Sequence, residues 1–468
     1  MQRNWERSIV MSCVLLAAGV PAWAAGRTRT SVPVIDSRNL AKAAAVAPAP
    51  GRRVRIENVQ KGDTGEAAAF VLERFQVFAP EAKITVHGPH GDQILPPPAN
   101  AYFRGTVAGQ PDSRVFLTVL PDGTAQGVVN EGGDTYLIGG EDEPAAKSLR
   151  APLAMQRIDP DNLKSSRGEE GFSCDNELLP PGRSTLDGLD FTGPAEKALT
   201  TTISTKAALY TARVAIETDY EYYLKFNDTT KASTYASNLI GYASTLYQTE
   251  INTSLVVQSI SLWTTSADPW NQTTNTCKLM EFGRYWNLNK TGVSRSIAHF
   301  LSGRAGSGVA WTGALCSGAF GASSSCSGLP TDAPWGGGYG FTGGITGAFN
   351  ISSPTVMWDI MSVAHEIGHN FNSPHTHCYN GIGDPSPVDQ CRSGDSGCYI
   401  GTQTLPGPAG AASGTLMSYC HLLTGSYSNI KWTFGTSQTY GVLPGRVPSR
   451  MSSYVASKAS SNPACLAP

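Results

Sequence analysis

The sequence lacks the features that mark a nucleic-acid-binding or membrane-spanning protein. Its 468 residues include 35 basic and 37 acidic side chains, and the basic residues form no run. A balanced charge without a basic patch gives no electrostatic footprint for nucleic acid or for an anionic membrane. No apolar run reaches the ~20 residues that a spanning helix needs. We therefore expect no nucleic-acid partner and no membrane span.

Charged residues are also few. They make up 15% of the chain, whereas 40% of the residues are hydrophobic, which is typical of globular rather than disordered protein. The length exceeds that of one ordinary core, so we expect two or three folded units. A phosphate-binding loop is missing as well, because no Gly-Lys-Ser/Thr follows the glycines from Gly336 to Gly347. We interpret that stretch as an irregular edge strand.

The N-terminus, Met1 to Ala24, has the pattern of a secretory signal peptide. Arg3 and Arg7 precede an apolar run from Ile9 to Val20, and Ala22-Trp23-Ala24 supplies the small residues of a cleavage site. The apolar run is too short for a membrane anchor, which needs ~20 residues. We therefore predict a signal peptide over 1–24 and a secreted, extracellular protein.

The ten cysteines divide by position. Cys13 would leave with the signal peptide, and Cys174 stands alone far upstream of the others. The remaining eight are Cys277, Cys316, Cys326, Cys378, Cys391, Cys398, Cys420 and Cys465. In an oxidising compartment, this even number favours four disulfides, although the sequence does not choose among the pairings.

Three stretches are expected between the signal peptide and residue 206. Residues 25 to about 60 have no clear period and are interpreted as a flexible leader. Residues 65–140 are β-rich. Residues 141–206 are polar and rich in proline and glycine, which is typical of a linker, and an exposed linker is a reasonable place for activating cleavage.

The β-rich stretch contains alternating and β-branched segments. Strands are predicted over Phe70–Phe78, Arg114–Leu120 and Ala125–Val129, with a hairpin turn at Pro121-Asp122-Gly123. His87 and His90 lie among glycines and prolines. We interpret both as solvated turn residues rather than metal ligands.

From residue 207 the pattern changes to alternating strands and helices. A strand over Leu209–Glu217, a helix around Ala236–Tyr247 and a strand over Ser254–Trp263 imply a parallel pair of strands. Further along we expect a helix over Ser294–Leu301, a strand over Gly308–Leu315 and a final helix over Val447–Ala456. This order predicts an α/β unit with helices packed on a sheet.

Candidate chemistry concentrates in His365-Glu366-Ile367-Gly368-His369-Asn370-Phe371-Asn372-Ser373-Pro374-His375. On a helix, His365 and His369 lie one turn apart on one face and can bind one metal ion, with Glu366 beside them. Three imidazoles leave one position of a tetrahedral zinc open to water. Zinc acidifies bound water and polarises a carbonyl, and a neighbouring carboxylate can take the proton, which suits peptide hydrolysis. The short H-E-x-x-H match alone can arise by chance on a surface helix.

The same stretch has a predicted helix start and end. Ser353 can cap a helix, and Pro354 suits its first turn. Asn372 falls where the chain must turn sharply to bring His375 back to the metal. Asparagine tolerates a left-handed backbone, so the turn is feasible at this position.

The motif resembles that of the metzincin zinc endopeptidases, H-E-x-x-H-x-x-G-x-x-H followed by a methionine turn. His365, Glu366, His369 and His375 match, and Asn372 stands where the family has glycine. The resemblance implies that the three histidines bind zinc and that Glu366 is the catalytic acid–base group.

The segment Gly414-Thr415-Leu416-Met417-Ser418-Tyr419 looks like the methionine turn. Met417 would then form an apolar floor under the three histidines and would not bind the metal. Tyr419 stands two residues beyond Met417, as does the tyrosine that approaches zinc in astacins and serralysins. It is either an oxyanion stabiliser or a packed residue of the turn.

Within the metzincins, the sequence is most similar to the reprolysin or adamalysin type. Tyr102 to Ile138 is similar to the propeptide of that type. Two departures are Thr376 after the third histidine, where reprolysins usually have aspartate, and the lack of a disintegrin-like cysteine array after the catalytic unit. The resemblance implies a mainly β propeptide domain over 25–206. It also implies an α/β (α+β) zinc metalloprotease domain over 207–468, with a twisted mixed sheet and an active-site helix.

A propeptide would give Cys174 a role. A thiolate binds zinc well, so Cys174 could fill the open position and exclude water, as the cysteine switch of the family does. The neighbours of Cys174 do not match the switch sequence of the family well, and an unpaired or mispaired thiol is the alternative.

Three further histidines lie outside the motif. His377 lies two residues beyond His375 and is a rival third ligand, although the family register favours His375. His299 and His421 have no ligand-like spacing, so we expect a buried or surface role for both.

The resemblance implies a secreted zinc metalloendopeptidase that cleaves proteins or peptides and is made as a latent zymogen. The propeptide would act as the inhibitor of the enzyme, and one Zn²⁺ ion would be its cofactor. The protein would be a monomer. No clear loop in the sequence supports a structural Ca²⁺ site. The alternative from another class is a secreted, zinc-stabilised binding or adhesion module without activity. Structural zinc sites usually use four protein ligands, so three histidines beside an unused carboxylate favour catalysis.

Overall fold

The computed structural model describes residues 32–139, 152–160, 162–163, 172–179, 210–321, 326–347, 349–350 and 353–466. The chain divides into two compact units, Met1–Val32 and Pro33–Pro468, and only the second is described here. The predicted signal peptide and most of the predicted linker lie outside the described residues. No described helix is long and apolar enough to cross a bilayer.

Within the described residues, eight strands form a first sheet in the order β1-β2-β10-β9-β8-β7-β6-β3. They are β1 (Val34–Asp36), β2 (Arg53–Lys61), β3 (Ala67–Phe75), β6 (Ala101–Val107), β7 (Gln110–Val119), β8 (Ala125–Glu131), β9 (Asp134–Ile138) and β10 (Ala154–Arg157). The predicted hairpin is confirmed, because β7 pairs with β8 in antiparallel register and Leu120 N donates to Thr124 O at 2.8 Å. The prediction of a flexible leader is wrong from Val34 onward, where β1, helix α1 (Ala41–Val46) and β2 form.

Both faces of the first sheet are buried. Val115 and Leu117 of β7 point into a core that includes α1, whereas Phe116 between them points into the core shared with helix α4 (Thr229–Ile251). Alternate residues of a strand face opposite sides, so one strand supplies two cores. This sheet therefore lies against the part of the chain that carries the metal-binding motif.

Seven described strands form a second sheet in the order β14-β15-β13-β11-β12-β4-β5. They are β4 (Phe78–Gly88), β5 (Gly91–Leu95), β11 (Tyr210–Thr218), β12 (Thr253–Trp263), β13 (Ile297–Leu301), β14 (Gly308–Ala310) and β15 (Tyr339–Thr342). Strands β11, β12 and β13 pair in parallel, whereas β14 is antiparallel to β15 and β5 to β4. The mixed sheet and the parallel strand-helix-strand unit are confirmed.

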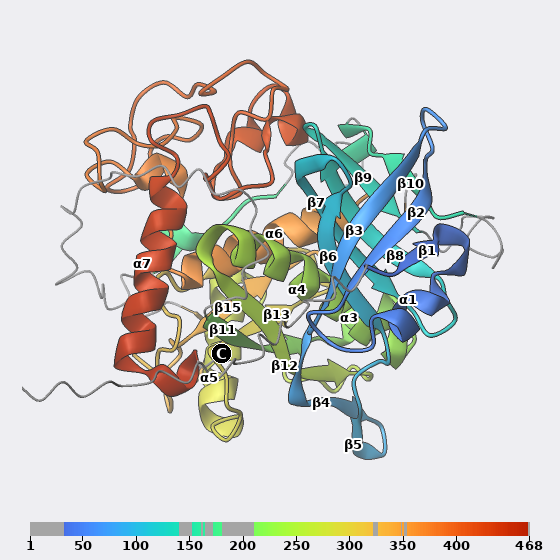
Figure 1. The fold of residues 1–468 in the computed structure, drawn as a ribbon. Coiled ribbons are helices and arrows are strands. Elements are labelled where there is room, and N and C mark those ends of the chain that lie inside the picture. Colours follow the sequence, from blue (N-terminus) through green and yellow to red (C-terminus); the bar gives the residue numbers. More distant parts are fainter. Residues whose placement is uncertain are drawn as a thin grey trace, which may run out of the picture. The chain divides into compact units, whose positions relative to one another are not determined.

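The described helices of this part are α3 (Tyr220–Leu224), α4, α5 (Asn275–Asn289), α6 (Val356–Asn370) and α7 (Arg446–Ser461) (Figure 1). Helix α4 has a side-chain N-cap, because the side chain of Asp228 accepts a hydrogen bond from Lys231 N. It ends at Asn252, whose backbone is left-handed. Short 3₁₀ turns complete the set. They are Ser37–Asn39, Asn176–Leu178, Thr376–Cys378, Cys420–Leu422, Ser426–Asn429 and Pro463–Cys465.

Two predicted elements are wrong. The helix over Ser294–Leu301 is strand β13, whose five residues Ile297–Leu301 are all buried. A short strand that is buried on both faces has no period of two, so its pattern cannot be told from a helix. The glycines over Gly336–Gly347 do include a strand, β15, but it lies between β13 and β14, so β14 is the edge strand.

Strand β4 and strand β5 come from the predicted β-rich stretch but belong to the second sheet, where β4 pairs in parallel with β12 (Figure 1). His87 on β4 is only 8% exposed, so its prediction as a solvated turn residue is wrong. His90 in the turn between β4 and β5 is exposed as predicted.

Four disulfides join the described cysteines, as predicted. The pairs are Cys277–Cys326, Cys316–Cys465, Cys378–Cys398 and Cys391–Cys420. Cys174 is buried and forms no disulfide.

Candidate metal centre

Helix α6 carries the first two histidines through the interior of the second unit. Every residue from Val356 to Asn370 is buried, so the helix is a core element rather than a surface helix that matches the motif by chance. The predicted cap at Ser353 is wrong, because the helix begins at Val356 and the N-cap residue, Thr355, makes no side-chain capping bond. A preceding turn, in which Met357 N donates to Pro354 O, already satisfies a donor of the first helical turn.

A left-handed residue turns the chain back after α6. Asn372 has φ of 71°, and Ser373 N donates to Gly368 O at 3.1 Å. Arg450 on α7 fixes the turn, because its Nε donates to Asn372 O at 2.6 Å and its second nitrogen donates to Asn372 Oδ1 at 3.1 Å. The turn brings His375 beside the helix, as the sequence predicted.

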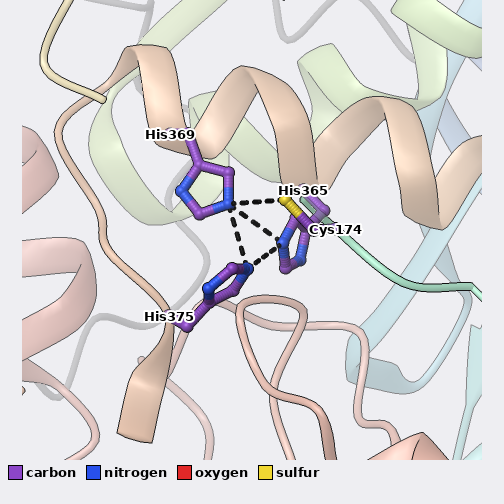
Figure 2. A group of neighbouring side chains, drawn as sticks. All are labelled: Cys174, His365, His369 and His375. Atoms are coloured by element: carbon purple, nitrogen blue, oxygen red, sulfur yellow. Dashed lines mark hydrogen bonds between the residues drawn. The ribbon is translucent and has the colours of Figure 1, made fainter. Parts of the chain in front are cut away.

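The three imidazoles point toward one another (Figure 2). The Nε2 atoms of His365 and His369 lie 3.1 Å apart, and His375 Nε2 lies 3.0 Å and 3.2 Å from them. All three rings are buried. Burial is the main cause that holds the pKa of each imidazole well below 6.5, so the rings are neutral.

The tautomers of two rings are fixed by backbone carbonyls. His365 Nδ1 lies 2.6 Å from Leu416 O, and His369 Nδ1 lies 2.7 Å from Ser373 O. In a neutral ring, Nδ1 must carry the proton that is donated to a carbonyl, which leaves a lone pair on Nε2. Two lone pairs then face each other at 3.1 Å with no proton between them.

A cation bound between the nitrogens would remove the repulsion between these lone pairs. Tetrahedral zinc with Zn–N bonds of about 2.1 Å separates its nitrogen ligands by roughly 3.4 Å, close to the spacing here. Neutral imidazoles whose other nitrogen donates to a carbonyl are the usual form of histidine at a zinc ion. The donor set therefore fits zinc.

Cys174 lies at the fourth corner of the group (Figure 2). Its Sγ is 3.5 Å from His369 Nε2 and 3.5 Å from Glu366 Oε2. The sulfur and the three imidazole nitrogens all lie within 4.8 Å of one another. The structure thus brings the five predicted residues together, although they come from segments almost two hundred residues apart.

The segment around Cys174 lies along edge strand β14 and forms a parallel bridge with it at Gly308. Gly308 N donates to Ser173 O at 3.1 Å, and Asp175 N donates to Gly308 O at 2.9 Å. Asn176 Nδ2 also donates to Thr312 Oγ1 at 2.7 Å. An extended segment that pairs with an edge strand uses the same bonds that an extended peptide ligand would use.

Two residues that follow Met417 hold the backbone of this segment. Tyr419 donates its hydroxyl to Cys174 O at 2.6 Å, and its ring centroid lies 4.4 Å from that of His375. His421 Nε2 lies 2.5 Å from Phe172 O. Burial lowers the pKa of His421 to about 4, so the ring is neutral and donates from Nε2 to that carbonyl. His421 is buried as expected, but its contact with the Cys174 segment had no signal in the sequence.

Gly308 is a further residue that sequence reasoning missed. A Cβ at this position would lie 1.9 Å from Glu366 Oε1, so only glycine leaves room for the carboxyl group of Glu366 beside the edge strand. Glu366 itself is fully buried next to Cys174. The side chain that the sequence singled out as the acid–base group is therefore confined by the edge strand and by the thiol.

The predicted methionine turn packs against helix α6. Met417 is buried, and its sulfur lies against α6 where Gly368 has no side chain, since a Cβ there would be 2.6 Å from Met417 Sδ. Met417 O accepts from both Thr376 N and Thr376 Oγ1. Thr376 thereby ties the methionine turn to the segment that carries His375.

His377, the rival ligand, lies outside the group. Its Nε2 is 2.7 Å from Asp395 Oδ2, and its ring stacks against His375 at 5.7 Å. Asp395 also accepts from Arg392 Nε at 2.9 Å. The cysteines that neighbour His377 in space, Cys378 and Cys398, are bonded to each other and offer no thiolate. His299 is buried and bonds to Thr342 Oγ1, as the prediction of a buried role allows.

Comparison with known proteins bears on this geometry. Residues 208–421 match the model of metallo-peptidase family M12, Reprolysin_5. The match spans α6, the three histidines and Met417, and it supports a zinc metalloprotease over this part of the chain. It begins after the segment that was expected to be a propeptide.

The comparisons with solved structures and with curated proteins give no further indication of function. The solved structure of metalloproteinase-II from Bacteroides fragilis is similar to this chain with 11% sequence identity and a TM-score of 0.34, covering 76% of this chain and 92% of that one. No curated protein matches the chain.

Proposed function

We propose that this protein is a secreted zinc-dependent endopeptidase, made as a latent precursor. The observation that carries the proposal is the group of three neutral imidazoles beside the buried carboxyl group of Glu366, at an edge strand that already holds an extended segment. Structural zinc sites use four protein ligands as a rule, whereas here the fourth position is taken by a residue of a separate segment.

His365, His369 and His375 would hold the metal. When bound, zinc would acidify a water molecule and polarise the carbonyl of the scissile peptide bond. Glu366 would accept the proton of the attacking water and return it to the departing amine. The edge strand β14 would bind the backbone of an extended protein or peptide substrate, as it binds the Cys174 segment here.

Tyr419 would donate a hydrogen bond to the substrate carbonyl. Its hydroxyl already donates to a backbone carbonyl, Cys174 O, beside the three histidines. Such a donor stabilises the negative charge that develops on the carbonyl oxygen during attack. An unchanged turnover number for Tyr419→Phe would remove this role and leave Tyr419 as a packed residue of the turn.

Latency would come from the Cys174 segment within a propeptide over 25–206. The thiolate would take the zinc position that catalysis needs open, and the same segment occupies the edge strand and the Tyr419 hydroxyl. The signal-like N-terminus and four disulfides support export to an oxidising compartment.

The test is cleavage of casein by the processed protein. We expect cleavage that phenanthroline abolishes and that added Zn²⁺ restores. If the processed, zinc-loaded protein cleaves no protein substrate, the endopeptidase is refuted and a zinc-stabilised binding module takes its place.

A further inference from the structure

The β4–β5 hairpin joins the N-terminal part of the chain to the sheet that positions the metal centre. Strand β4 pairs in parallel with β12 from Ser259↔Lys83 to Trp263↔His87. Backbone bonds continue at both ends, because Val257 N donates to Val77 O at 2.7 Å and Thr264 N donates to His87 O at 3.0 Å. Without this hairpin, β12 would be the edge of the sheet.

The hairpin also shares the apolar core of that sheet. The buried apolar side chains of β4 are Phe78, Ala79, Ala82, Ile84 and Val86, and they belong to the same cluster as Leu255, Val257, Ile260 and Leu262 of β12. Burial of several apolar side chains, together with ladder hydrogen bonds, holds a strand in place whether or not it is covalently linked to its neighbour.

His87, near the end of β4 that leads into the hairpin turn, connects the hairpin to β12 through its side chain. Its Nε2 lies 2.9 Å from Ser261 Oγ, its Nδ1 lies 2.6 Å from Asp92 Oδ1, and its ring stacks on Trp263 with a centroid distance of 4.1 Å. His90 lies in the turn of the same hairpin and is exposed. The two histidines thus form a matched pair, one at the junction and one in solvent.

The first sheet makes a second contact, on helix α4. Thr118 Oγ1 donates to Asn238 Oδ1 at 2.7 Å, and the hydroxyls of Tyr102 and Ser237 lie 2.8 Å apart. The ring of Phe116 packs where Gly241 has no side chain, since a Cβ there would be 2.7 Å from the ring. The side chains on this face of α4 are mostly small and polar. Such a face suits a contact between two separate polypeptides as well as a contact within one core.

We propose that the edge of β12 and the polar face of α4 form a binding surface for the N-terminal part of the chain, strands β1 to β10, as a separate polypeptide. Cutting the chain in the 141–206 linker would then produce a two-chain protein, in which the N-terminal piece stays bound through β4 and the first sheet. The inference rests on the proposed function only in that the linker is expected to be cut during maturation. Freeing the metal centre would require removal of the Cys174 segment and not departure of strands β1 to β10.

The test uses the full precursor carrying Glu366→Gln, with the recognition sequence of a site-specific protease inserted between residues 164 and 171, so that the Cys174 segment stays with the C-terminal piece and does not hold the two pieces together. After complete cutting, verified on a denaturing gel, the protein is run on a gel-filtration column at micromolar concentration and neutral pH. We expect both pieces in one peak at the size of the precursor. Elution of the two pieces in separate peaks would overturn the proposal.

The junction is tested with substitutions in the same cut protein. His87→Ala should raise the dissociation constant of the two pieces by about tenfold, the effect of losing a buried hydrogen-bonded contact, while His90→Ala should leave it unchanged. Ser261→Ala removes the partner of His87 with less change in volume and should act in the same direction. Equal dissociation constants for all three variants would contradict the role of the hairpin.

Failure of this inference is distinguishable from failure of the proposed function. Association is measured in a protein that carries Glu366→Gln and therefore does not depend on proteolysis. Absence of casein cleavage by processed wild-type protein would refute the endopeptidase and leave the association result unaffected.

Discussion

At the scale of single residues, the site depends on groups that are held neutral and close together. His365 and His369 each direct a lone pair at the same point, because their other nitrogens donate to the carbonyls of Leu416 and Ser373. The pairing of His365 and His369 beside Glu366 could be predicted from their spacing, whereas the choice of His375 over His377 depended on the resemblance to the metzincins. The carbonyls could not be predicted, because they come from the methionine turn and from the turn after α6.

Cys174 provides the first residue-scale prediction. In Cys174→Ala, the uncut precursor should cleave casein measurably, because the zinc position that the thiolate would fill becomes open to water. The rate should stay below that of the processed protein, since the segment still pairs with β14. Ser173→Ala is the matched control, because its hydroxyl contacts Ser307 rather than the histidines. A Cys174→Ala precursor as inactive as the wild type would rule out the switch.

Other residues at the site carried no sequence signal. Gly308, His421 and Phe172 reach the predicted group or the Cys174 segment only through the fold, and each lies more than forty positions from the histidine motif. Gly308 is one glycine of the fifty in the chain. Only the position of Glu366 beside β14 shows why this one matters.

At the scale of elements, α6 and the turn after it form the unit that builds the metal centre. The apolar periodicity of the sequence predicts the helix and its buried face. The tolerance of asparagine for a left-handed backbone predicts that the helix ends near Asn372. The role of Arg450 could not be predicted from the sequence, because α7 is far away along the chain and approaches Asn372 only in the fold.

Asn372 gives a prediction for this element. Asn372→Ala should destabilise the protein by about 1–3 kcal/mol, because alanine is strained at positive φ and the bond from Arg450 to Oδ1 is lost. Asn372→Gly should cost less, since glycine adopts φ of 71° without strain. The measurement is the free energy of unfolding in denaturant, with the metal kept in excess. A larger loss in the glycine variant than in the alanine variant would contradict this explanation.

Strand positions show where prediction from pattern fails. β11, β12 and the β7–β8 hairpin follow from β-branched residues and turn signals. The pattern around β13 predicts a helix instead, because Ile297–Leu301 is buried on both faces and shows no period of two. The pairing of β4 with β12 could not be predicted, because pairing between distant strands is set by the packing of the whole core and not by local sequence.

At the scale of the whole molecule, the interior of the second sheet contains an acid that responds to pH. Glu217 on β11 is fully buried and accepts from Trp263 Nε1 at 2.9 Å and Trp286 Nε1 at 3.0 Å. Despite these bonds, burial raises the pKa of Glu217 from 4.5 to about 7. The native state therefore holds this proton at pH values where the unfolded chain has released it.

The sign of the pH dependence follows from linkage. The contribution of Glu217 to stability is fully present below pH about 4.5 and is lost as pH rises through about 7, a change of up to about 3 kcal/mol. Glu217→Gln should remove this slope from the free energy of unfolding, measured between pH 4.5 and 7 in a Glu366→Gln background. The amide leaves one indole without its acceptor, but that cost does not vary with pH. Equal slopes in both proteins would contradict a raised pKa.

The central claim is that this chain holds a catalytic zinc with Glu366 as the acid–base group. The most direct measurement compares zinc content and kcat/KM for a protein substrate in processed wild-type protein and in Glu366→Gln. The account predicts about one zinc per chain in both proteins and a loss of roughly 10²–10⁴-fold in kcat/KM for the variant. A variant that keeps substantial proteolysis, or an active wild-type protein without zinc, would contradict it.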